Sequence, residues 1–266
     1  MLHKFMSIDP VRLALYATIM TWLFTLLGSA VVIFFKKVNK TVMDSMLGVA
    51  SGVMIAASFW SLLEPGIERA ALKGQIPWLI ASLGFISGTL LIILSDKIVN
   101  KVTKKFDNAS KSKLNRILML IISITVHNIP EGLAVGLAFG GLKGNLTEPL
   151  LMGAFLFALG IGIQNFPEGA AVSLPLRREG YSRKKAFFIG QLSGFVEPIA
   201  GVIGALLVIK IESILPFFLC FAAGAMIFVV IRELIPESQN NSNKNLITFF
   251  TILGFVIMMV LDVGLG

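Results

Sequence analysis

Eight runs of apolar residues, each long enough to cross a lipid bilayer as a helix, dominate this sequence. A helix of about 20 apolar residues spans the hydrocarbon core of a membrane, and the alternating pattern that transmembrane strands need is absent from these runs. Apolar residues make up 56% of the chain and charged residues only 14%, which excludes an ordinary soluble domain. The runs cover Val11–Phe35, Ser45–Leu63, Pro77–Ser95, Ile117–Gly140, Pro149–Leu176, Ala186–Ile209, Ser213–Ile231 and Leu246–Leu261. The sequence therefore predicts an all-α integral membrane protein, a bundle of eight transmembrane helices.

Positive charge is concentrated in alternate loops between these runs. Of the 23 Lys and Arg residues, 17 lie after the first, third, fifth or seventh run. Because cytoplasmic loops carry an excess of Lys and Arg, both termini are expected to be extracytoplasmic. The formal net charge of +8 follows from this topology, so we expect no nucleic-acid partner. No long linker interrupts the runs, and residues 1–266 are expected to form a single membrane domain.

Two copies of one polar phrase lie within the fourth and fifth runs. HNIPEGLAVGL begins at His127, and QNFPEGAAVSL begins 37 residues later at Gln164. Ionisable groups at membrane depth are costly and mark functional sites. The two runs cross the membrane in opposite directions, which suggests an inverted repeat of the kind that builds transporter sites near the bilayer midplane.

Each copy places two metal-ligating side chains on one face of its helix. His127 and Glu131 are four residues apart, as are Gln164 and Glu168, so each pair stacks along the helix. An imidazole nitrogen, two carboxylates and an amide oxygen can then converge between the fourth and fifth helices. The alternative is that these side chains only hydrogen-bond neighbouring helices.

A proline lies inside each copy, at Pro130 and Pro167. Each lacks an N–H group and deprives the carbonyl four residues earlier, on Val126 or Ile163, of its usual partner. We therefore expect proline-broken segments in both helices, with freed carbonyls that suit a hard or borderline cation.

Further acidic residues lie in the sixth and seventh runs. Glu197 precedes Pro198 in the middle of the sixth run, where it either joins a metal site or takes part in a metal-free polar network. Arg232 and Glu233 lie at the cytoplasmic end of the seventh run. They either have a functional role or simply lie at a solvated helix end, and the two interpretations are equally supported. The one cysteine, Cys220, excludes a thiolate zinc cluster.

Taken together, these phrases resemble the ZIP (ZRT/IRT-like) family of divalent metal transporters. The two copies are followed by GFVEPIAG from Gly194 and ELIPE from Glu233, and the resemblance covers essentially the whole chain. The segment from Gly52 to Leu63 is most similar to the GufA/ZupT-like bacterial branch. The resemblance implies a multi-pass transporter of a bacterial cell membrane, a homodimer in the lipid bilayer, and not an enzyme.

The resemblance also implies a binuclear metal site. One ion would be bound by Met54, His127, Glu131, Gln164 and Glu168; a second would use Asn128, Asn165 and Glu197 together with shared ligands; Glu233 would belong to an exit path. This chain departs from the family's pattern at three positions. Gln164 and Asn165 stand where relatives often carry His and Asp, and Arg232 stands where a ligand is often found.

The implied activity is the inward movement of zinc by alternating access, with an elevator-type motion and no prosthetic group. Imidazole, carboxylate and amide ligands also suit cadmium, iron, manganese and cobalt, and the lack of thiolates disfavours copper(I). Three alternatives remain: an intramembrane metalloenzyme, although no His-Glu-x-x-His motif is present, and a metal channel or an exporter on the same helices.

Overall fold

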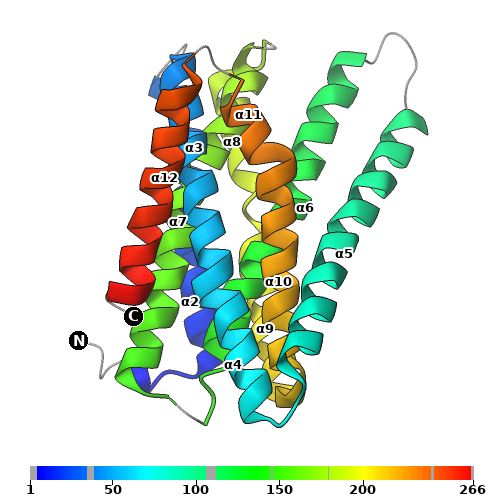
Figure 1. Cartoon of the computed structure of the whole chain (residues 1–266). Coiled ribbons are helices and arrows are strands. Elements are labelled where there is room, and N and C mark those ends of the chain that lie inside the picture. The colour runs from blue at the N-terminus through cyan, green and yellow to red at the C-terminus, as the bar shows by residue number, and fades with distance from the viewer. Residues whose placement is uncertain are drawn as a thin grey trace.

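In a computed structural model the chain forms a bundle of long helices (Figure 1). The structure describes residues 5–34, 39–105, 112–144, 146–178, 180–240 and 243–264, and none of these lies in a β-strand. The helices are α2 (Pro10–Phe34), α3 (Lys40–Ala57), η1 (Ser58–Leu63), α4 (Glu64–Leu72), α5 (Pro77–Lys105), α6 (Ser112–Gly140), α7 (Glu148–Arg178), α8 (Arg183–Leu192), α9 (Val196–Lys210), η2 (Glu212–Ile214), α10 (Leu215–Val229), η3 (Val230–Leu234), α11 (Ile235–Ser238), α12 (Lys244–Met259) and η4 (Val260–Gly264). The predicted all-α fold is confirmed.

Seven stretches of the described residues are long and apolar enough to cross a membrane. They are Pro10–Phe34, Lys40–Leu72, Pro77–Ile98, Glu148–Arg177, Arg183–Lys210, Leu215–Ser238 and Lys244–Gly264. Each contains most of one predicted run. The remaining run, Ile117–Gly140, lies in α6, and its side chains up to residue 124 are outside the described ones. The eighth span therefore stays a prediction.

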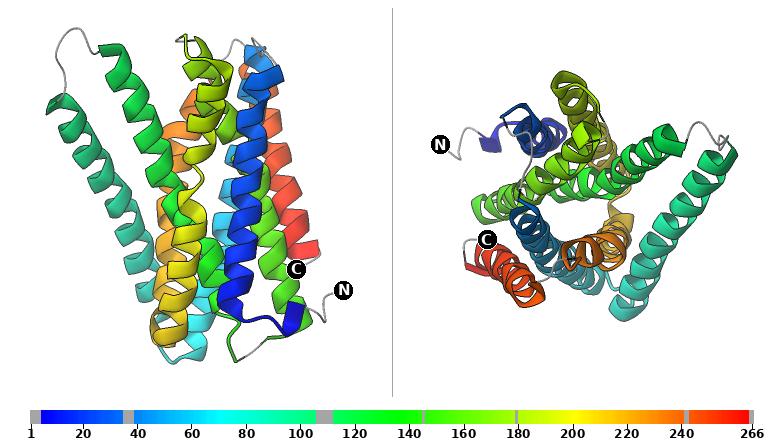
Figure 2. Two further views of the ribbon diagram at one scale, coloured as in Figure 1. Left: turned by 180° about the vertical axis from the view of Figure 1, so that it is seen from behind. Right: turned by 90° about the horizontal axis from the view of Figure 1, so that it is seen from above.

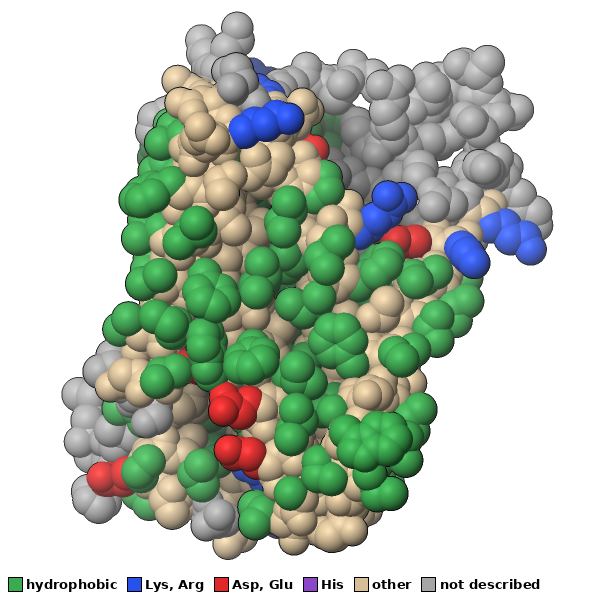
Figure 3. All heavy atoms as spheres, viewed as in Figure 1, with side chains coloured by type: hydrophobic (Ala, Val, Ile, Leu, Met, Phe, Trp, Pro, Cys, Tyr) green, Lys and Arg blue, Asp and Glu red, His purple; other side chains and the backbone are tan. Residues whose placement is uncertain are grey.

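Both described ends of the chain lie toward the same end of the bundle, as the predicted eight crossings would require. Helix α2 begins there and η4 ends there (Figures 1 and 2). Hydrophobic side chains cover much of the face drawn in Figure 3, and Lys and Arg gather toward its upper end. Exposed apolar residues such as Leu90, Leu94 and Ile252 lie on stretches that are long and apolar enough to cross a membrane. Which side of the membrane the termini face stays a prediction.

The helices pack mainly as four pairs: α2 with α7, α3 with α12, α5 with α10, and α6 with α9. Glycine allows the close approach within each of these pairs, including the two that contain the polar phrases. A Cβ atom added to Gly132 of α6 would lie 2.5 Å from the carbonyl oxygen of Glu197 in α9. A Cβ atom at Gly28 of α2 would overlap the carbonyl oxygen of Phe166 in α7. These contacts bring the two polar phrases and Glu197 to the same depth.

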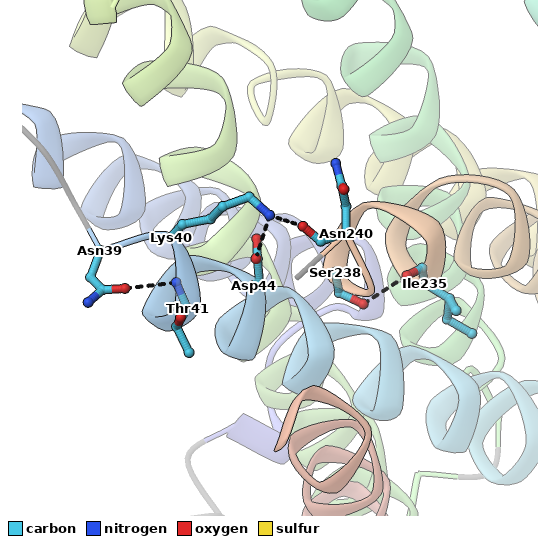
Figure 4. Close-up of polar contacts among 7 residues, drawn as sticks. All are labelled: Asn39, Lys40, Thr41, Asp44, Ile235, Ser238 and Asn240. Atoms are coloured by element: carbon cyan, nitrogen blue, oxygen red, sulfur yellow. Dashed lines mark hydrogen bonds and ion pairs between the residues drawn. The ribbon is translucent and has the colours of Figure 1, made fainter. Parts of the chain in front are cut away.

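At the opposite end from the termini, polar contacts connect the start of α3 to the end of α11 (Figure 4). The Asn39 side chain accepts a hydrogen bond from the Thr41 N–H group at 2.8 Å, which caps α3. Lys40 donates to the buried Asp44 carboxylate at 3.1 Å and also to the carbonyl oxygen of Asn240. These bonds fix the beginning of α3 against the chain that follows α11.

Candidate metal site

Buried polar side chains from four helices meet in the middle of the bundle. Each is at most 8% exposed, although the surrounding residues are apolar. They are Thr21 of α2, Asn128 and Glu131 of α6, Gln164, Asn165 and Glu168 of α7, and Glu197 of α9. We call this set the polar cluster. It contains six of the nine predicted site residues. It also includes Thr21 of α2, a helix for which no role in the site was predicted.

Glu197 is the most completely hydrogen-bonded member of the polar cluster. Its Oε1 and Oε2 atoms both accept from Asn165 Nδ2 at 2.9 Å, and Oε2 also accepts from the Thr21 hydroxyl at 2.5 Å. Asn128 Nδ2 donates to Oε1 at 3.4 Å. Donors to a charged carboxylate offset part of the cost of burying it. Glu197 therefore takes part in a polar network, and its role as a metal ligand stays a prediction.

Three oxygens of the polar cluster lack hydrogen-bond partners among the described residues: Asn128 Oδ1, Glu131 Oε2 and Gln164 Oε1. In the two amides, Asn128 and Gln164, the nitrogen atom already donates a hydrogen bond. Asn128 Nδ2 donates to the Ser193 carbonyl at 3.2 Å, and Gln164 Nε2 donates to Asn165 Oδ1 at 3.3 Å. A buried polar atom without a partner costs about 1–3 kcal/mol. Oxygen atoms in this state suit a cation that would coordinate them.

The buried carboxylates also repel one another. Glu131 lies within electrostatic range of Glu197, and Glu168 lies within range of both Glu131 and Glu233. Among the side chains that the structure describes, no Lys or Arg forms an ion pair with Glu131, Glu168 or Glu197. A divalent cation between them would relieve this repulsion, because an opposite charge favours the ionised carboxylates.

The donor set is mixed rather than purely acidic. Across the described ranges, no group of three or more His, Cys, Asp or Glu side chains is placed to hold one metal ion. Amide oxygens from Asn128 and Gln164 would have to complete the coordination. His127 belongs to α6, one turn before Glu131, and its side chain lies outside the described part of the chain.

The other predicted ligands lie on helices outside the polar cluster. Met54 is buried in α3 within the main hydrophobic core, and its role as a ligand stays a prediction. Glu233 is half-buried in η3, and the neighbouring Arg232 is exposed. The helical span continues past both residues to Ser238, so they do not lie at a helix end.

Helix continuity differs from the prediction. Helices α6 and α7 run without a break through Pro130 and Pro167, so the expectation of proline-broken segments there was wrong. The break occurs in the sixth span, between Leu192 and Val196. Pro198 cannot donate to the Gly194 carbonyl, which instead accepts from the Glu197 N–H group at 3.0 Å. The break places Glu197 at the first turn of α9.

Short π-helical turns also escaped the sequence analysis. η1 follows Met54 by one turn and η3 contains Glu233, and each ends just before a proline, Pro65 or Pro236. Turns of this kind are frequent at functional sites. The Glu-Pro and Ile-Pro pairs were the signals that could have revealed them.

A cavity of about 580 Å³ opens at the end of the bundle where the termini lie. Its lining includes Ser61, Leu137, Phe157 and Asp262. Ser61 donates to Asp262 Oδ1 at 2.6 Å, and the buried Oδ2 atom has no partner among the described residues. Figure 3 shows acidic groups among hydrophobic side chains in the lower half of one face. Leu137 follows Glu131 by six residues, so the cavity begins about 9 Å along α6 from the polar cluster.

Comparison with known proteins gives one consistent family. The sequence model of the ZIP zinc transporter family matches residues 108–262. Zinc transporter ZIP11 of Bos taurus is 38% identical, over 97% of this chain and 98% of its own length. Zinc transporter GufA of Myxococcus xanthus is 32% identical over 95% of this chain and 98% of its own length. Zinc transporter ZIPB of Bordetella bronchiseptica is 33% identical over 91% of this chain and 78% of its own length.

Proposed function

Because the chain belongs to the ZIP zinc transporter family, we propose that it carries zinc into the cytoplasm through a site between α6 and α7. Members of this family are transporters and not enzymes, so the chain is a multi-pass metal transporter. The observation that carries the finer proposal is the group of buried oxygens without partners on Asn128, Glu131 and Gln164. Three such atoms on two adjacent helices provide the start of a coordination shell for a cation.

The first ion is proposed to bind Glu131, Gln164 and Glu168, completed by His127 and Met54. Carboxylate and amide oxygens hold a divalent ion more weakly than a closed thiolate site does, which permits release. The same ligand types accept cadmium, iron, manganese and cobalt. A second ion is proposed to bind less tightly, because both Glu197 oxygens already accept hydrogen bonds from Asn165.

Transport is proposed to follow an alternating-access mechanism. All members of the polar cluster lie on α2, α6, α7 and α9, and these helices contact one another. The remaining long helices pair with each other, as α3 with α12 and α5 with α10, and they contact the first group through α7 and α6. We propose that the first group moves against the second, which would supply the homodimer contact and remain static in the cell membrane.

The route of the ion is proposed to begin at the cavity near Ser61 and Asp262. Its place at the end that carries the termini fits an extracytoplasmic opening, given the distribution of Lys and Arg. Glu233 is proposed to receive the ion on the cytoplasmic side, supported by its electrostatic contact with Glu168. Eight spans, with α6 as the fourth, complete this topology.

The test is zinc uptake into proteoliposomes that contain the purified chain. Saturable uptake is expected for the wild type and for Glu148→Gln, which changes an exposed acid in the first turn of α7. The double variant Glu131→Gln, Glu168→Gln keeps the side-chain size and is expected to lose uptake. Full uptake in the double variant would place the site elsewhere, and flux that does not saturate would favour a channel.

A further inference from the structure

Helix α2 presents a line of buried hydroxyl groups to α7, α8 and α9. Thr18, Thr21, Thr25 and Ser29 follow one another at spacings of three or four residues, which places them on one face of the helix. All are at most 1% exposed. Two of them donate hydrogen bonds to backbone carbonyl groups, Thr18 to Ala14 and Ser29 to Gly169. Thr25 Oγ1 has no partner among the described residues.

Thr21 is the member of this line that reaches the polar cluster. Its hydroxyl lies 2.5 Å from Glu197 Oε2 and 2.9 Å from the carbonyl oxygen of Thr18. A hydroxyl has one proton to donate, and the carboxylate is the stronger acceptor. The Thr21 carbonyl oxygen in turn accepts from Asn165 Nδ2 at 3.3 Å. One residue of α2 therefore contacts both Glu197 and Asn165.

These contacts determine which way the amides of α7 face. Asn165 Nδ2 is committed to Glu197 and to the Thr21 carbonyl, so Asn165 Oδ1 points toward Gln164 and accepts from its Nε2 atom at 3.3 Å. The Gln164 side chain also hydrogen-bonds Glu131, and with its nitrogen engaged in these contacts it leaves Oε1 without a partner among the described residues. A chain of hydrogen bonds thus connects the Thr21 hydroxyl, through Glu197 and Asn165, to Gln164, a proposed ligand.

We propose that Thr21 is a positioning residue of the metal site, acting through Glu197 and Asn165 to present Gln164 Oε1 to the transported divalent cation. This inference rests on the proposed function, since it assigns Gln164 as a ligand. Without the hydroxyl, Glu197 loses a charge-assisted donor and depends on Asn165 Nδ2, so Asn165 is held less firmly in place to accept from Gln164. Only the hydrogen bond between Gln164 and Glu131 then orients the Gln164 amide. An ion must then order these side chains as it binds, which weakens its affinity.

The test compares zinc binding by purified full-length variants in equilibrium dialysis. Thr21→Val keeps the branched shape and the carbonyl but removes the donor, and its Kd for zinc is expected to rise about tenfold. Thr21→Ser keeps the hydroxyl and is expected to restore the wild-type Kd. Thr25→Val is the matched control, because it removes a buried hydroxyl from the same face that has no partner among the described residues. Its Kd is expected to be unchanged.

Zinc uptake by the same variants supplies a second readout. Thr21→Val is expected to raise KM about tenfold and to change kcat less than about twofold, since only ligand positioning is affected. Thr21→Ala serves in its place where Thr21→Val unfolds in a thermal melt. A wild-type Kd in both hydroxyl-free variants overturns the inference, as does an equal loss of affinity in Thr21→Ser. If zinc binds with the expected dependence on Thr21 but is not transported, the inference is supported and the proposed transport is overturned. If the wild type binds no zinc, both are overturned.

Discussion

Replacing Gly132 by alanine tests whether the approach of α6 to α9 builds the polar cluster. The new Cβ atom would lie 2.5 Å from the carbonyl oxygen and 2.6 Å from the Cα atom of Glu197, both of which belong to the backbone of α9. Non-bonded heavy atoms are most favourable near 3.5 Å, so the two helices must separate by about 1 Å. Because neither contact atom is at the end of a flexible side chain, a change of rotamer cannot relieve the overlap.

Two consequences follow from this separation. Overpacking of this kind costs about 1–3 kcal/mol of stability. Asn128 and Glu131 also move away from Glu197, which lengthens the 3.4 Å contact between Asn128 and Glu197 beyond hydrogen-bonding distance. We expect zinc uptake to fall at least about tenfold, since displacements of about 1 Å in a preorganised site have effects of this size or larger.

The assay pairs a thermal melt with uptake in proteoliposomes, and Gly153→Ala is its matched control. Gly153 lies in α7, where an added Cβ atom would meet nothing within 4 Å. This control is expected to melt and transport like the wild type. A Gly132→Ala variant that is as stable and as active as Gly153→Ala would refute the claim that close helix approach positions the site.

Three further outcomes are expected. Gly153→Phe should fill the cavity near Asp262 without a backbone clash, so uptake should fall while the melting temperature stays near that of Gly153→Ala; undiminished uptake would show that the ion takes another route. Uptake should decrease as pH falls, because metal ligands bind in their deprotonated forms and protons compete for Glu131 and Glu168; a rate that is flat or rises on acidification, at constant free zinc, would contradict carboxylate ligation. Ser61→Ala should leave Asp262 without its hydroxyl donor and change zinc KM more than kcat, whereas an equal change in both constants would argue against a role in capturing the ion.

Much of this architecture could be predicted from the sequence, because bilayer thickness sets the length of each apolar run. One inaccurate range was Ser45–Leu63, where the helical stretch continues from Lys40 to Leu72. The polar residues Glu64 and Arg69 hide this extension, since they end the apolar run but not the helix. The members of the polar cluster on α6, α7 and α9 were found because acids and amides at membrane depth are rare and costly.

The remaining features depend on packing between distant segments. Nothing local distinguishes Thr21 from Thr18 or Thr25, and only the contact of α2 with α9 selects it. Pro130 and Pro167 were poor guides to helix breaks, whereas Pro198 together with Gly194 marked the real one. A proline inside a buried helix removes one hydrogen bond, and the neighbouring helices decide whether the backbone opens there.

Metal binding at the polar cluster is tested most directly by an anomalous diffraction measurement on crystals of the purified protein soaked with cadmium. We expect a peak between α6 and α7, within coordination distance of Glu131, Glu168 and the Gln164 Oε1 atom that lacks a partner among the described residues. Strong cadmium peaks confined to other positions, such as the Asp262 carboxylate, with none at the polar cluster, would contradict it.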